Sequence, residues 1–232
     1  MNQIIINNKL IEYQIIYTKR FGLGIYYHPD QQPPFTVRCS KRYSQKKIEE
    51  FFLKEASWIL RQVDRPINKD FRLFGKVYEV IREKGSKNRI IVDQERVIIT
   101  QIDPNDDEIL NRLVTNLWKK LLKKYIESKV DEYAQVTQKY KVVFSYRLMT
   151  SRYGSCKPAG NKITLNTQLA TFPPELIDSV VYHEYAHFRV QNHSKAFYAI
   201  LSTYTPNYRE LNRSLKKFGF SNPSQCAKIN SK

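Results

Sequence analysis

Short apolar runs bounded by glycine, proline and charged residues dominate the first hundred residues, and this pattern predicts β-strands. Residues 10–17 are rich in Ile and Tyr, and residues 35–39 alternate apolar and polar side chains like a half-buried strand. Another strand begins near Gly24, after a Gly-Leu-Gly turn. Residues 71–81 and 90–100 each hold two strand-like runs separated by a short turn, which predicts two hairpins.

One helix interrupts these strands. Ser44 is placed to cap a helix that extends to about Val63, with apolar residues such as Ile48 and Ile59 largely on one face. We therefore expect residues 1–102 to form a β-rich N-terminal subdomain with one helix.

A long amphipathic helix is predicted next. Asp103 is placed as its cap, Pro104 in its first turn, and acidic residues follow where they meet the positive end of the helix dipole. The apolar stripe continues to roughly Tyr133, while lysines occupy the other side, most simply as a solvated face. The stripe consists of Leu110, Leu113, Val114, Leu117, Trp118, Leu121, Leu122 and Tyr125.

The remaining chain predicts a small sheet followed by helices. Residues 142–148 and 162–166 have strand patterns, and the second of these is either an edge available to an extended ligand or an ordinary sheet member. Pro173-Pro174 opens a helix, because proline is favoured in a first helical turn. We expect one domain at 103–220 and a frayed tail at 221–232.

Two shorter helices complete this domain. Ser194 is placed to cap the first, and the second starts at Thr205-Pro206 and ends at Gly219. The pattern of the whole chain is therefore α+β.

Composition narrows the class of protein. The chain has 232 residues, 41% of them hydrophobic, and no run approaches the roughly 20 apolar residues of a membrane span. The N-terminus lacks the pattern of a signal peptide. The three cysteines, Cys39, Cys156 and Cys226, are scattered and form no Cys-x-x-Cys pair, which is typical of reduced cytoplasmic protein.

The net charge is +17, divided between residues 1–130 (+9) and residues 131–232 (+8). A basic surface of this kind could contact nucleic acid, although no nucleic-acid-binding motif accompanies it. A solvated basic surface explains the charge equally simply.

The chemistry is concentrated in one motif, His183-Glu184-Tyr185-Ala186-His187. On a helix, residues four apart share a face, so His183 and His187 can ligate one metal ion. Glu184 lies about 100° round the helix and is free to act as the general base of a hydrolase.

A catalytic zinc ion needs a third protein ligand, and His193 is the candidate. The His187-to-His193 spacing matches that of metzincins, but Val190 stands where those enzymes have a glycine. Asn192 is the better candidate for a left-handed turning residue. The fourth histidine, His28, lies far away in sequence.

These motifs together resemble the YgjP-like metallopeptidase family, whose members are often described as predicted metal-dependent hydrolases. The resemblance extends over residues 10–219. The segments that carry it are Arg152-Tyr153-Gly154-Ser155-Cys156, Ile163-Thr164-Leu165-Asn166, Leu169, Pro173-Pro174, Ile177-Asp178, the His183–His187 motif, Asn192-His193-Ser194 and Phe197-Tyr198. Tyr153 and Tyr198 stand where the family usually has Trp, and both keep an aromatic ring.

The resemblance implies a zincin-like catalytic domain with one Zn²⁺ at His183, His187 and His193, acting on protein or peptide. Arg152 and Tyr208 are candidates to stabilise the oxyanion, although Arg152 could instead pair with Asp178. SprT-like and WLM-type relatives include proteases that act on protein attached to DNA.

The alternatives are therefore a metal-dependent hydrolase of a non-peptide amide, a nucleic-acid-associated protease, or a nucleic-acid-binding module recruited by its basic surface. The sequence does not indicate an oligomeric state.

Overall fold

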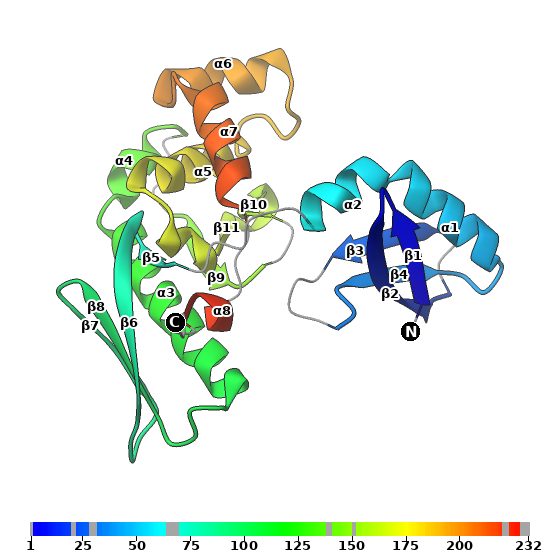
Figure 1. Cartoon of the computed structure of the whole chain (residues 1–232). Helices are drawn as coiled ribbons and strands as arrows, with labels where there is room; N and C mark the ends of the chain where they lie inside the picture. Colours follow the sequence, from blue (N-terminus) through cyan, green and yellow to red (C-terminus); the bar gives the residue numbers. More distant parts are fainter. Residues whose placement is uncertain are drawn as a thin grey trace. The chain divides into compact units, whose positions relative to one another are not determined.

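The computed structural model describes residues 2–19, 22–27, 32–63, 70–137, 141–149, 152–219 and 223–227. His28 and residues 228–232 lie outside this set. The chain divides into two compact units, Met1–Ile67 and Asn68–Lys232 (Figure 1). Each unit has its own hydrophobic core. The architecture is mixed α+β, as predicted. Among the described helices, none combines the length and the apolar composition needed to cross a bilayer.

The first unit is a four-stranded sheet covered by two helices. Its strands are β1 (Asn2–Ile6), β2 (Lys9–Tyr17), β3 (Leu23–Tyr27) and β4 (Phe35–Cys39), in the order β1-β2-β4-β3. β2 and β4 are parallel, and the other pairs are antiparallel. Alternate strand residues such as Tyr13 and Val37 are fully buried in one core with Phe52 and Ile59 of the helices.

The predicted helix from Ser44 to Val63 is two helices, α1 (Gln45–Lys54) and α2 (Ala56–Val63). Ser44 caps α1 as predicted, and its side chain accepts a hydrogen bond from the Lys47 amide. The prediction of one helix was wrong because Glu55 leaves the helical conformation, with φ −92° and ψ 10°. The spacing of apolar residues does not reveal this break, because α1 and α2 each still have buried residues.

The second unit begins with a sheet of β5 (Phe71–Leu73), β6 (Lys76–Lys84), β7 (Arg89–Asp93) and β8 (Arg96–Gln101), in the order β5-β6-β8-β7. Both predicted hairpins are present, since β5–β6 and β7–β8 pair antiparallel. The division of the chain nevertheless precedes this sheet, whereas the predicted boundary followed it at residue 102.

Shared burial explains why these hairpins belong to the second unit. Phe71 and Ile99 are buried in the same core as the helices that follow. The β5–β6 turn has Phe74 and Gly75 at positive φ. Their amides donate to the carbonyls of Ala170 and Thr171, just before the metal-site helix. Contacts of this kind join segments a hundred residues apart and are invisible to local pattern.

The long helix α3 spans Asp107–Glu127 and is followed by the short helix α4 (Val130–Ala134). Asp106 is the cap, and its side chain accepts from the Ile109 amide. The predicted cap, Asp103, instead accepts from the Asn105 amide in a local turn before the helix. The predicted single helix to Tyr133 therefore starts later and is interrupted.

α3 is the centre of the second core, with a fully buried residue every fourth position. These residues are Leu110, Val114, Trp118, Leu122 and Ile126. This is the stripe that an i, i+4 apolar spacing predicts.

A three-stranded sheet packs against the metal-site helix. It contains β9 (Val143–Arg147), β10 (Gly154–Lys157) and β11 (Lys162–Asn166), in the order β10-β11-β9. β11 pairs with a neighbour on each side. The hypothesis that residues 162–166 form an available edge is therefore wrong, and β10, which the sequence pattern did not predict as a strand, occupies an edge.

The remaining helices are α5 (Pro174–Ala186), α6 (Lys195–Tyr204), α7 (Tyr208–Phe218) and α8 (Pro223–Ala227) (Figure 1). Gly219 ends α7 with φ 62°, as predicted. The predicted frayed tail is wrong for α8, because Cys226 and Ala227 are buried in the second core. Ser194 occupies the cap position of α6 without a side-chain capping bond.

Candidate metal centre

Helix α5 is a buried helix that presents its histidines at its C-terminal end. Pro173 is its N-cap and Pro174 its first residue, where the missing amide hydrogen costs nothing. His183 lies in its last turn, and His187 is its C-cap. The burial of most of its other residues holds the backbone that orients these imidazoles.

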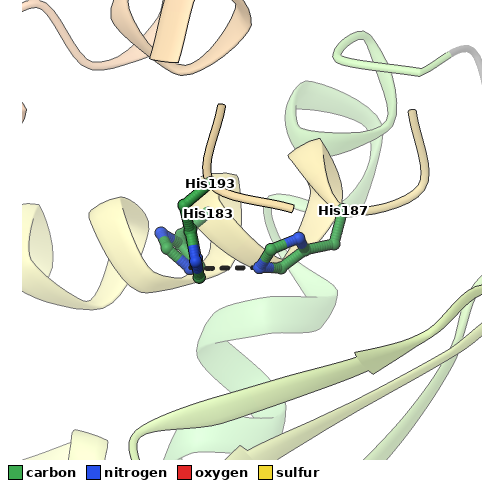
Figure 2. A group of neighbouring side chains, drawn as sticks. All are labelled: His183, His187 and His193. Atoms are coloured by element: carbon green, nitrogen blue, oxygen red, sulfur yellow. Dashed lines mark hydrogen bonds between the residues drawn. The ribbon is translucent and has the colours of Figure 1, made fainter. Parts of the chain in front are cut away.

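Three imidazoles converge here, those of His183, His187 and His193 (Figure 2). His183 Nε2 lies 3.2 Å from His187 Nε2 and 3.1 Å from His193 Nε2. Within the described part of the chain, this is the group of His, Cys, Asp and Glu side chains that could hold a metal ion.

The donor set fits a zinc ion. A tetrahedral ion with Zn–N bonds near 2.0–2.1 Å separates its ligand nitrogens by about 3.3 Å, close to the two distances given above. Three imidazoles leave a fourth position for water or substrate, which is typical of catalytic rather than structural zinc sites.

The turn between the second and third histidines uses right-handed backbone. After His187 the chain continues as a helical turn, with the Val190 amide donating to the Ala186 carbonyl. Neither Val190 nor Asn192 has a positive φ among the described residues. The prediction that Asn192 supplies a left-handed turning residue is therefore wrong. Three residues in a helical turn after His187 already reverse the chain toward His193.

The same turn sets the tautomer of His187. Its Nδ1 lies 3.1 Å from the Val190 carbonyl oxygen, which can only accept, so Nδ1 carries the proton and Nε2 presents its lone pair. Burial lowers the pKa of His183 to about 4, and the neighbouring histidines add to this effect. Burial also lowers the pKa of His187. Both rings are thus neutral near pH 7, as metal ligands must be.

The carboxylate of Glu184 lies against strand β10. Only 6% of the residue is exposed, and its carboxylate accepts a hydrogen bond from the Cys156 amide. Burial raises its pKa to about 7, while the positive charge of Arg152 and the Cys156 amide oppose that rise. A carboxyl with such a pKa can accept and return a proton near neutral pH.

The loop that carries Arg152 is held against strand β11 by the side chain of Asn166. The buried Asn166 side chain donates to the carbonyl oxygens of Met149 and Arg152 and accepts from the Met149 amide. The alternative pairing of Arg152 with Asp178 is not what the structure shows. The charge that acts on Glu184 is that of Arg152, and Asp178 has other partners.

Asp178, on α5, is the central hydrogen-bond acceptor of a polar cluster that the sequence did not predict. The hydroxyls of Tyr125 and Tyr133 donate to its Oδ1 at 2.6 and 2.5 Å, and Lys129 Nζ lies 2.6 Å from its Oδ2. Glu132 accepts from the Tyr182 hydroxyl at 2.6 Å. The cluster ties α3 and α4 to α5 just before His183. No local signal predicts it, because its partners are about 50 residues apart.

Tyr208, the other candidate oxyanion donor, lies beside the metal ligands. Its ring centroid is 6.3 Å from that of His183, with the rings nearly parallel. Tyr198, on α6, lies 5.6 Å from Tyr208 and 6.4 Å from His193. The two tyrosines therefore flank the histidines on the side of α6 and α7.

A protein-family model matches most of this chain. The model of the YgjP-like metallopeptidase domain matches residues 24–218. Among solved structures, the chain is similar to the metallopeptidase zymogen jannalysin of Methanocaldococcus jannaschii. The two share 20% identity at a TM-score of 0.37, over 40% of this chain and 95% of the other. A search of curated proteins found no match.

Proposed function

This chain belongs to the YgjP-like metallopeptidase family, and from that membership and the site geometry we propose that it is a zinc-dependent peptidase. The single observation that carries the proposal is the convergence of the imidazoles of His183, His187 and His193, with the buried carboxylate of Glu184 next to His183 in the chain.

His183, His187 and His193 would hold the ion through their Nε2 atoms. Zinc at such a site lowers the pKa of water toward neutrality and polarises a carbonyl group. The Val190 carbonyl supports this assignment because it fixes the ring of His187 with its lone pair toward the other two histidines.

Glu184 acts as the general base in this proposal. Its carboxylate takes a proton from the attacking water and returns it to the leaving amine nitrogen. Its burial and its raised pKa support both halves of this transfer, since the carboxylate is ionised often enough to accept a proton and is basic enough to hold one.

Arg152 and Tyr208 are the proposed donors to the developing oxyanion. The positive charge of Arg152 acts on Glu184, and the ring of Tyr208, on α7, lies beside that of His183. Because they approach from different elements, single substitutions can separate their contributions.

An extended substrate would pair with β10 rather than with β11. β11 has partners on both sides, whereas β10 is an edge strand whose Cys156 amide already bonds to Glu184. Substrate pairing along this strand would place the scissile bond near the general base.

Cleavage of an unfolded protein by metal-loaded enzyme tests the proposal, with E184Q as the matched isosteric variant. We expect one zinc ion per chain in both proteins, and a loss of activity of about a hundredfold or more in E184Q. Cleavage by E184Q at the wild-type rate, or no cleavage of any polypeptide by the zinc-loaded wild type, would exclude this mechanism.

A further inference from the structure

A cavity of about 860 Å³ lies between α6 and α7, beside the metal centre. Tyr198 and Tyr208 form part of its wall. The ring of Tyr208 also lies beside His183 and that of Tyr198 beside His193, so the cavity and the metal centre share these two side chains.

The wall of this cavity is polar and basic. Lys195 and Arg209 contribute cations, Glu210 is its one carboxylate, and Asn212 adds an amide. Both cations are exposed, and within the described ranges neither forms an ion pair. The surrounding segment, residues 187–219, has the same character, with six Lys or Arg residues against one Glu.

We propose that this cavity is a substrate subsite that binds acidic side chains of the polypeptide on one side of the scissile bond. Lys195 and Arg209 supply the charge, and the phenols of Tyr198 and Tyr208 supply polar edges close to the histidines. This inference rests on the proposed peptidase function and adds the substrate class to it.

The composition of the wall favours an acidic peptide over a nucleic acid. A nucleic-acid backbone carries a negative charge at every nucleotide and binds grooves with many cations. Here two cations stand with one carboxylate, Glu210, which would repel a continuous line of phosphates. A peptide can place one or two carboxylates against the cations and leave neutral residues opposite Glu210.

Binding to E184Q tests the subsite without turnover. The probes are two fluorescent peptides that differ only in having Asp and Glu, or Asn and Gln, on one side of the central bond. We expect the acidic peptide to bind about tenfold more tightly, and K195E/R209E to abolish or reverse that preference. K119E/K120E is the matched control, because it makes the same change in net charge on the exposed face of α3. The control should keep the preference.

The wild-type enzyme should show the same preference in kcat/KM for the two peptides. Equal binding of both peptides, or equal loss of preference in K195E/R209E and K119E/K120E, would overturn the subsite. A labelled single-stranded oligonucleotide that binds more tightly than the acidic peptide, and is lost only in K195E/R209E, would also overturn it. If neither peptide is cleaved but the binding preference persists, the peptidase proposal fails while the subsite stands.

Discussion

Gly154 lies directly against the carboxylate of Glu184. A Cβ atom at position 154 would stand 2.7 Å from Glu184 Oε1 and 2.8 Å from its Cγ, closer than such atoms approach in folded proteins. Glu184 is buried, so its side chain has little room to retreat. A missing side chain on an edge strand thus sets where the proposed general base can lie.

G154A should therefore displace Glu184 and lower kcat/KM by at least about tenfold, because proton transfer depends on the position of the base. The zinc content should stay at one ion per chain, since the histidines lie on other elements. G160A is the matched control, because a Cβ at Gly160 meets nothing within 4 Å. Wild-type kinetics in G154A would show that the position of Glu184 is not critical.

H193A should weaken zinc binding by about a hundredfold or more, because it removes the third ligand of the proposed site. Competition with a chelator at fixed pH measures this change. His193 is exposed, so circular dichroism should show an intact fold. N192A should bind zinc like the wild type, since Asn192 adopts no special backbone conformation. Equal zinc affinity in H193A would remove His193 from the site.

The stability of metal-free protein should depend on pH through Glu184. Its folded-state pKa is raised to about 7, so its stability contribution is complete below about pH 4.5 and is lost as the pH rises through 7. In E184Q this loss is absent. The free energy of unfolding of E184Q relative to wild type should grow from under about 1 kcal/mol at pH 5 to about 3 kcal/mol at pH 8. Urea unfolding measures both values, and a difference that does not change with pH would contradict the assignment.

Tyr133 should make the fold sensitive to alkali. Burial raises its pKa most, and the hydrogen bond to Asp178 and the charge of that residue add to the effect. A phenol with a raised pKa stabilises the fold below about pH 10, and this contribution is lost as the pH rises further. Between pH 10 and 11.5 the unfolding free energy of the wild type should fall more steeply than that of Y133F, by about 1.4 kcal/mol per pH unit.

At neutral pH, Y133F should itself be less stable by about 1.5 to 3 kcal/mol, because it removes a hydrogen bond to a charged acceptor. Denaturant unfolding at pH 7 measures this cost. Parallel pH profiles for the two proteins would mean that Tyr133 does not titrate with unfolding.

Two features could not be predicted because the pattern of neighbouring residues does not indicate which distant segments of the chain pair with each other. The run at 162–166 reads the same whether it is an edge or the centre of a sheet, and only its pairing with β9 and β10 makes it central. The partners of Asp178 were equally hidden, because they come from a segment about 50 residues earlier.

Other errors concern ends of helices. Asp103 and Asp106 are equally good caps by residue type, and the chain uses Asp106 because Asp103 is engaged in a turn with Asn105. The break at Glu55 and the helical turn after His187 are likewise choices of backbone conformation at one or two residues, which apolar periodicity does not detect.

The sequence by itself determined the features that depend on the spacing of residues along a single helix or strand. The i, i+4 spacing puts His183 and His187 on one face of α5, and the buried stripe of α3 follows from the same period. Tertiary structure alone decided that His193 returns to His183, that Gly154 makes room for Glu184, and that the two hairpins join the second core. These depend on contacts between distant segments, whose free energy comes from packing and not from any residue's own preference.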